Sequence, residues 1–433
     1  MAADISGDGH ACDGREMRMR NNNNELIYPA KAVYALGKAL RKIDNRLIDH
    51  GERVAYLTCK LNEYGGFNLD TKKLFILSLF HDIGAYKTEE IDRMLEFESN
   101  EVTNHSVYGY LFLKHMSPLE DCAEAVLYHH SNWVDILKSD TKYKEYATLI
   151  KLCDRIDVAL VLTSSQGKVS SQIANCQSCY KPEFVKCALD ALKRTSLLKD
   201  LNSSTVDKDN LNRCEGLAIS ENEALEYLKL IVYSIDFRSE LTVTHTINTI
   251  SLALDIAQHF GLEDSMCEKI KLGALLHDVG KLAIPLSILE HPGRLSTEQM
   301  AIMKTHVDET KDIIDGIVNN EIRDLALAHH EKLDGSGYPL GITAQNLSFP
   351  QRIIAVADIV SALSSRRSYK EPFPKERIIT ILREMEETQL DAAICDYVCD
   401  NYDLIVDNTE GAREQIIRQY NTIKSEYEAL ISH

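Results

Sequence analysis

The chain has 433 residues, of which 44% are hydrophobic and 26% charged, as is typical of a globular protein large enough for two or three domains. No apolar run reaches about 18 residues, which argues against a membrane span. The N-terminus also lacks the basic and apolar regions of a secretory signal, so we expect a cytoplasmic protein. The net charge of −18 argues against a nucleic-acid polymer as partner, but it does not exclude a small phosphate ligand held through metal cations.

The N-terminal third divides into a polar arm and a helical region. Residues 1–24 are rich in asparagine and charge, so we expect a disordered arm. In residues 25–163 the apolar side chains recur mostly at helical spacing, as at Leu74, Leu77 and Phe80. This pattern predicts a first, all-α domain.

The remaining chain predicts a linker, a second domain and a tail. Residues 164–236 combine Ser/Gly punctuation, a polar stretch and a helical pattern near 220–236, which indicates a linker and a connecting helix. The second domain is expected over residues 237–395. The tail, 396–433, carries apolar residues at helical spacing from about 411 onward, which predicts an amphipathic helix that packs on its own domain or on a partner.

The eleven cysteines suggest reduced thiols, because their number is odd and no signal peptide is present. Cys176 and Cys179 form the one CxxC motif. Without a second pair or flanking histidines, a zinc or redox role is the less favoured interpretation. Cys395 and Cys399 fit one face of a helix and are expected in the core.

The chain is organised around a His-Asp pair, His277-Asp278, which ends an apolar helical run and is followed by Gly280 and Lys281. A neutral imidazole is a good transition-metal ligand, and a neighbouring carboxylate can bridge two ions. We expect Gly280 to let the backbone turn and Lys281 to direct a cation at whatever the metals hold.

This motif belongs to an internal repeat of metal-ligand residue types. In the second half the series is His245, His277, Asp278, His306, His329, His330 and Asp358. In the first half it is His50, His81, Asp82, His105, His129, His130 and Asp154. Satisfied core histidines are the alternative, but the same order at nearly the same spacing favours two metal sites.

Five histidines and two aspartates are enough for two divalent ions, with Asp278 as the bridge and open positions for water and substrate. Two metals about 3.5–4 Å apart can clamp a phosphate between them. Mixed ligands of this kind fit iron or manganese, and also zinc, better than magnesium. We therefore expect two divalent ions in the second domain, and allow for metal in the first.

Longer motifs in the second half carry a family resemblance. They are the runs Pro292 to Leu295, His329 to Pro339, Arg352 to Asp358 and Arg367 to Lys370. Over residues 240–395 they resemble the HD-GYP family of metal-dependent phosphohydrolases. The resemblance implies an all-α domain that hydrolyses cyclic dinucleotides, chiefly cyclic di-GMP, at a centre of two or three metals. The fold then predicted is a tandem of HD-type helical domains with a C-terminal amphipathic helix.

Position by position, the resemblance assigns roles to the second series. All seven of its residues match metal ligands, and Lys281 matches a lysine near the scissile phosphate, so Asp278 and Lys281 are the expected catalytic residues. Arg367 and Lys370 match residues that contact substrate phosphates, and on a helix they share a face.

Gly337, Tyr338 and Pro339 match the loop that names the family. We expect this loop to shape the substrate groove, with Tyr338 offering an aromatic face to a purine. A rigid turn with a core tyrosine is the alternative.

Three positions depart from the family pattern. Leu241 stands where some members place a glutamate for a third metal, and Glu240 would point about 100° away on a helix. We therefore predict a two-metal site. Ser239 and Ser361 replace aspartates that the family often has, and loss of an outer carboxylate could loosen a ligand or slow the reaction.

The first copy, over residues 40–160, resembles the broader HD superfamily. It keeps every ligand type but has Arg46 at the third-metal position, Ala85 in place of the lysine and no Gly-Tyr-Pro sequence; Lys87 is the candidate substitute for the lysine. A second hydrolase site, a ligand sensor and a structural metal site are the three interpretations.

The leading functional prediction is a phosphodiesterase that opens a cyclic dinucleotide, with cyclic di-GMP favoured, and releases the linear dinucleotide. One alternative is a cyclic-dinucleotide receptor without turnover. Another is a nucleotide phosphohydrolase that acts through the first domain. The expected partner is thus a small cyclic dinucleotide, and the terminal helix leaves a homodimer open.

Overall fold

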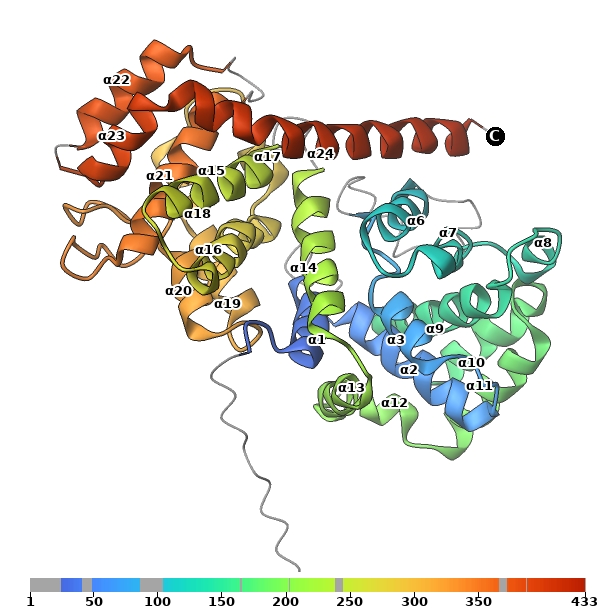
Figure 1. Ribbon diagram of the computed structural model, residues 1–433. Helices are drawn as coiled ribbons and strands as arrows, with labels where there is room; N and C mark the ends of the chain where they lie inside the picture. The colour runs from blue at the N-terminus through green and yellow to red at the C-terminus, as the bar shows by residue number, and fades with distance from the viewer. Residues whose placement is uncertain are drawn as a thin grey trace, which may run out of the picture.

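The computed structural model is built from α-helices (Figure 1). It describes residues 25–40, 49–85, 104–163, 166–201, 203–237, 244–365, 372–386 and 388–432. Within these ranges there is no β-strand, and extended pairing is confined to the isolated bridges Ile27–Val318 and Asp334–Thr343. The all-α fold predicted from the sequence is confirmed.

The first half is a helical bundle around one core. Its helices are α1 (Pro29–Leu40), α2 (His50–Gly65), α3 (Thr71–Leu79), α6 (Asn104–Met116), η2 (Glu120–Cys122), α7 (Glu124–Leu127), α8 (Trp133–Ile136) and α9 (Lys144–Thr163). The side chain of Asp70 caps α3 by accepting a hydrogen bond from the Lys73 backbone N–H at 2.9 Å. The apolar run that follows is buried against α2, and this packing positions the first His-Asp pair, which follows the end of α3.

The segment between the two halves is also helical. It contains α10 (Gln166–Asn175), η3 (Gln177–Cys179), α11 (Pro182–Arg194), α12 (Leu197–Asp200), α13 (Thr205–Gly216) and α14 (Glu221–Asp236). Helices α11 and α13 pack on α2, and α10 packs on α9. The polar stretch forms α13 because Val206 and Cys214 share its buried face, where Asn210 donates to the Glu52 carbonyl at 2.9 Å. A capping box of Ser220 and Glu223 starts α14.

The second half repeats the bundle. Its helices are α15 (His245–His259), α16 (Asp264–Leu276), η4 (Val279–Ala283), α17 (Leu286–Leu289), α18 (Thr297–Lys304), α19 (His306–Ile314), α20 (Asn320–Leu327), α21 (Phe349–Ser364), α22 (Lys375–Glu386), α23 (Ala392–Asp400) and α24 (Tyr402–Ile431). Helix α15 packs on α16, α21 and α24, and α16 packs on α20. This packing brings the ends of α16, α20 and η4 to one place.

Three helices join the halves. Helices α1 and α14 lie between them, and the long helix α24 runs from the second half across to α6 of the first (Figure 1). There the rings of Tyr108 and Tyr427 stack with centroids 4.0 Å apart, and Tyr427 donates to Asn104 Oδ1 at 2.9 Å. Lys114 pairs with Glu426 at 2.8 Å. The tail helix therefore packs on its own chain, and it begins at Tyr402, earlier than the sequence pattern suggests.

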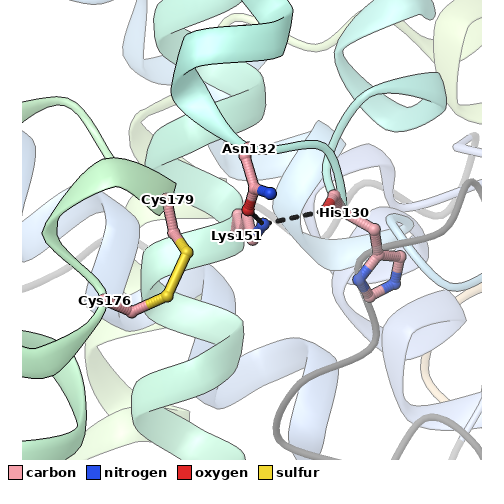
Figure 2. Close-up of a disulfide and its surroundings, with 5 residues drawn as sticks. All are labelled: His130, Asn132, Lys151, Cys176 and Cys179. Atoms are coloured by element: carbon pink, nitrogen blue, oxygen red, sulfur yellow. Dashed lines mark hydrogen bonds between the residues drawn. A yellow bond between two sulfur atoms is a disulfide. The ribbon is translucent and has the colours of Figure 1, made fainter.

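Cys176 and Cys179 form a disulfide, which differs from the expectation of reduced thiols for this pair (Figure 2). The short η3 turn brings their Cα atoms to 5.5 Å, within the range that a disulfide requires. The other cysteines of the described residues are free thiols, and Cys395 and Cys399 lie in the core as expected.

Among the described residues, no helix combines the length and the apolar character needed to cross a bilayer.

Candidate metal centres

In the second half, the predicted ligands come from the ends of several helices. His245 and His306 are the first residues of α15 and α19, and His277 directly follows α16. His329 and His330 follow α20, while Asp358 lies inside α21, buried with its side chain toward the others. The seven side chains predicted as ligands lie together.

Asp278 lies between two groups of histidines. Its Oδ2 atom is 3.1 Å from His277 Nε2 and 3.5 Å from His245 Nε2. Its Oδ1 atom is 3.5 Å from His306 Nε2 and 3.9 Å from His329 Nε2. One carboxylate thus offers one oxygen to each group, which is the arrangement of a carboxylate that bridges two metal ions.

Hydrogen bonds at the far ring nitrogens orient these histidines. His277, His306 and His329 direct Nδ1 at the carbonyl oxygens of Ala274, Met303 and Ala326, at 2.7, 2.6 and 2.7 Å. Because a carbonyl only accepts, each Nδ1 donates, and in the neutral imidazole Nε2 then carries the lone pair that a metal ion would use. Among the described residues, His277 Nε2 and Asp278 Oδ1 are buried without a hydrogen-bond partner. A pair of divalent cations fits these unsatisfied atoms.

Burial and mutual charge set the protonation of the cluster. Burial opposes ionisation of Asp278, but the neighbouring His277 and Lys281 hold the pKa of its carboxyl well below its usual range. Burial also lowers the pKa of His330 to about 4, which keeps this imidazole neutral. Against the same burial, Asp278 and Asp358 raise the pKa of His277 to about 10 in the absence of a cation. A metal ion would therefore displace a proton from His277 as it binds.

The Gly-Tyr-Pro loop lies against the histidines. The Tyr338 ring centroid is 4.6 Å from that of His330, and the Lys304 ammonium lies 4.8 Å from the same tyrosine ring centroid. Gly337 allows the loop to pack this closely, since a Cβ there would lie 2.5 Å from both the Glu331 Cα and the Lys332 backbone nitrogen. The buried Glu331 carboxylate accepts hydrogen bonds from the Leu340 and Ile342 N–H groups, at 2.7 and 3.1 Å.

Sequence reasoning overlooked three residues near this centre. Two of them are Lys304 and Glu331, whose contacts are described above. The position of Glu331 directly after the paired histidines was the sequence signal that could have identified it. Asp236, the last residue of α14, is buried and lies within electrostatic reach of His245 and Lys281. It lies on α14, a helix that carries none of the predicted ligands, so no local pattern linked it to them.

Gly280 lies in η4, which follows α16, and it has a packing role there that the sequence did not indicate. A Cβ on Gly280 would lie 2.0 Å from the His306 carbonyl oxygen and 2.4 Å from the Thr310 N–H nitrogen. The glycine therefore permits close packing of η4 on α19. In the first half, a Cβ on Gly84 would likewise lie 2.0 Å from the His105 carbonyl oxygen.

Of the predicted phosphate-binding cations, Lys281 contacts Asp278 directly. Arg367 and Lys370 lie outside the described residues, as do the positions of Ser239, Glu240 and Leu241. In the first half, Arg46 and Lys87 also lie outside them, and Ala85 is buried.

The first half assembles its series in the same way. Asp82 Oδ2 is 3.2 Å from His81 Nε2 and 3.6 Å from His50 Nε2. Asp82 Oδ1 is 3.5 Å from His105 Nε2 and 3.6 Å from His129 Nε2. His130 Nε2 lies 2.9 Å from His105 Nε2, and Asp154 Oδ1 lies 3.4 Å from His50 Nε2. These residues also fit metal ions, since within the part of the chain that the structure describes His81 Nε2 and His129 Nε2 are buried without a hydrogen-bond partner.

Buried cations distinguish the first centre. Arg155 donates to Asp154 Oδ2 from Nε at 3.0 Å and from Nη2 at 2.7 Å. Lys151 donates to the His130 carbonyl at 2.8 Å and to Asn132 Oδ1 at 2.9 Å, and Figure 2 draws these contacts together with the disulfide. Both cations are buried, whereas Lys281 of the second centre, which contacts Asp278, is partly exposed, at 27%.

Comparisons with known proteins agree with this duplication. Residues 229–394 and residues 47–159 each match a family model described as HD domain. The 3′3′-cGAMP-specific phosphodiesterase 1 of Vibrio cholerae is 27% identical over 394 residues, which cover 86% of this chain and 91% of the relative. The cyclic di-GMP phosphodiesterase response regulator RpfG of Xanthomonas campestris is 34% identical over 187 residues, 42% of this chain and 50% of the relative.

Two further proteins are similar to this chain, one in sequence and one in structure. A cyclic di-GMP phosphodiesterase of Thermotoga maritima is 36% identical over 169 residues, 38% of this chain and 45% of the relative. The chain thus spans about half the length of the two cyclic di-GMP relatives. The crystal structure of the V. cholerae cyclic GMP-AMP phosphodiesterase V-cGAP3 superposes with a TM-score of 0.57 at 17% identity, covering 87% of this chain and 98% of that one. At this identity the likeness establishes the fold.

Proposed function

We propose that this chain, which belongs to the HD-domain proteins and carries two such domains in tandem, is a metal-dependent phosphodiesterase that opens a cyclic dinucleotide. The observation that carries the proposal is Asp278, whose two oxygens face two separate groups of histidine Nε2 atoms. Relatives that match about two fifths of the chain, and one that matches most of it, are named as phosphodiesterases of cyclic dinucleotides.

We assign each side chain of the second centre one task. His245, His277, Asp278, His306, His329, His330 and Asp358 would hold two divalent ions, with iron or manganese favoured. Bound there, the ions supply Lewis-acid charge and lower the pKa of water. Lys281, a partly exposed cation beside Asp278, stabilises negative charge that develops on a phosphoryl oxygen. Tyr338 and Lys304 form a wall beside His330 against which the substrate lies.

For the substrate we propose cyclic di-GMP, with the linear dinucleotide as the main product of a two-metal centre. The competing substrate is 3′3′-cGAMP, for which the relative that aligns over nearly the whole chain is named. Parallel turnover of the two dinucleotides decides between them. Complete breakdown to mononucleotides as the main product would contradict the two-metal assignment.

The test measures hydrolysis of both dinucleotides with added Mn²⁺ or Fe²⁺ and counts bound metal. It compares the wild type with His277→Ala/Asp278→Ala and with the matched His81→Ala/Asp82→Ala variant of the first domain. We expect loss of activity only in His277→Ala/Asp278→Ala. Loss only in His81→Ala/Asp82→Ala would place the chemistry in the first domain. Binding of dinucleotide without turnover in the metal-loaded wild type would make the protein a receptor.

A further inference from the structure

The two centres differ in the residue behind one equivalent histidine. In the first centre, His50 Nδ1 lies 2.7 Å from Asp157 Oδ2. In the second, His245 Nδ1 lies 3.0 Å from Ser361 Oγ. Asp157 and Ser361 each stand three residues after the aspartate of their series, so they occupy the same position of the repeat. The structure therefore contains both versions of one outer-shell contact.

The next residue outward differs in the same sense. Arg53, three residues after His50, donates to Asp157 Oδ1 from Nε at 2.5 Å and to Oδ2 from Nη2 at 2.8 Å. At the equivalent position Asn248 donates to Ser365 Oγ at 3.4 Å. A buried Arg-Asp-His relay in the first domain thus corresponds to a neutral group in the second.

Ser361 preserves the orientation of its histidine while it removes the charge. Its hydroxyl donates to the His245 carbonyl at 3.0 Å, which leaves the oxygen to accept from Nδ1. The His245 tautomer is therefore the one that a carboxylate would select. A carboxylate behind a ligating imidazole also raises its basicity, and loss of such an outer partner typically costs about 10–100-fold in metal affinity.

Two other pairs of equivalent histidines do not differ in the partner of Nδ1. His81 and His129 of the first centre direct Nδ1 at the carbonyls of Ser78 and Val126, at 2.8 and 2.5 Å. Their counterparts His277 and His329 do the same in the second centre. Backbone carbonyls support these two pairs in the same way, whereas the partner of Nδ1 differs in charge between His50 and His245. Arg155 at Asp154 and Lys281 at Asp278 are separate differences, which exchanges behind His50 and His245 leave in place.

We propose that the exchangeable metal position of this protein is the one formed by His245, His277 and Asp358, because Ser361 and Asn248 stand behind it. The equivalent position in the first centre, formed by His50, His81 and Asp154, holds its ion firmly because Asp157 stands behind His50. The expected ratio of dissociation constants is about 10–100-fold. The second domain would then follow the supply of free metal while the first stays occupied. This inference rests on the metal-ligand assignment of the proposed function, and it is independent of which dinucleotide is hydrolysed.

The experiment measures Mn²⁺ binding to the full chain by equilibrium dialysis. Two backgrounds each leave one centre intact: His81→Ala/Asp82→Ala and His277→Ala/Asp278→Ala. The largest dissociation constant, and so the weakest Mn²⁺ binding, should belong to the second centre. Adding Ser361→Asp should tighten it about tenfold or more, whereas Ser361→Asn, of the same size but uncharged, should leave it as in the wild type.

The reverse exchange guards against a folding defect in the second domain. Arg53→Asn/Asp157→Ser installs the neutral pair in the first centre and should weaken its Mn²⁺ binding by a similar factor. Thermal melting reports whether each variant is folded. Equal tightening by Ser361→Asp and Ser361→Asn, or unchanged affinity after both exchanges in folded protein, would overturn the proposal. Failure of hydrolysis with these metal affinities intact would count against the proposed function alone.

Discussion

Asp236→Asn is predicted to stabilise the metal-free protein in a pH-dependent way. Asp236 ends α14 and is 7% exposed. Burial raises the pKa of its carboxyl from 3.8 to about 6, although a hydrogen bond from Thr246 and the His245 charge act in the opposite direction. The folded protein therefore prefers the neutral acid, and asparagine mimics that form in size and hydrogen bonding.

The magnitude follows from proton linkage. Each pKa unit corresponds to about 1.4 kcal/mol, so ionised Asp236 costs the native state about 3 kcal/mol above pH 7. Because the folded pKa is raised, the native state binds more protons between pH 4 and 6. Its stability thus falls as pH rises through that window. The gain from Asp236→Asn should be about 3 kcal/mol at pH 8, about half of that at pH 5 and smallest near pH 4.

The assay is thermal unfolding of chelator-treated protein between pH 5 and 8. One kcal/mol corresponds to about 2–4 °C for a domain of this size, so the variant should melt several degrees higher at pH 8. The exposed Asp407→Asn on α24 controls for the loss of one charge and should give no pH-dependent difference. A gain independent of pH, or a loss at pH 8, would refute the reasoning.

Three further predictions concern the second domain. Gly280→Ala drives a Cβ into the His306 carbonyl and should cost about 1–3 kcal/mol or more and release metal from the second centre only; Gly84→Ala should release metal from the first centre only, and metal counts that fall at both centres in either variant would contradict this. Glu331→Ala removes the acceptor for two loop N–H groups, so KM for the dinucleotide should rise about tenfold, with a smaller change in kcat; an unchanged KM would show that the loop does not need this anchor. Lys281→Met should lower kcat about tenfold or more at unchanged metal content, and full retention of kcat would remove Lys281 from the chemistry.

Local sequence patterns were sufficient for the secondary structure and for the list of candidate ligands. Apolar residues at helical spacing predict helices because the period belongs to the helix itself. Histidine is rare, so its repeated order with aspartate marked both series, and the two centres contain those residues. The prediction that Asp278 bridges two ions came from the chemistry of a His-Asp pair alone.

Contacts between distant segments were decided only by the tertiary structure. The family resemblance marked Ser361 as the site of a lost outer carboxylate, but not that it contacts His245, 116 residues away. Nor did any local pattern place Asp157 behind His50, 107 residues away. Gly280 reads as a turn residue in sequence, yet it serves the approach of another helix. Helical periodicity determines which face of an element is buried, but the neighbour on that face depends on how all the helices pack, and that neighbour sets the charge at each metal position.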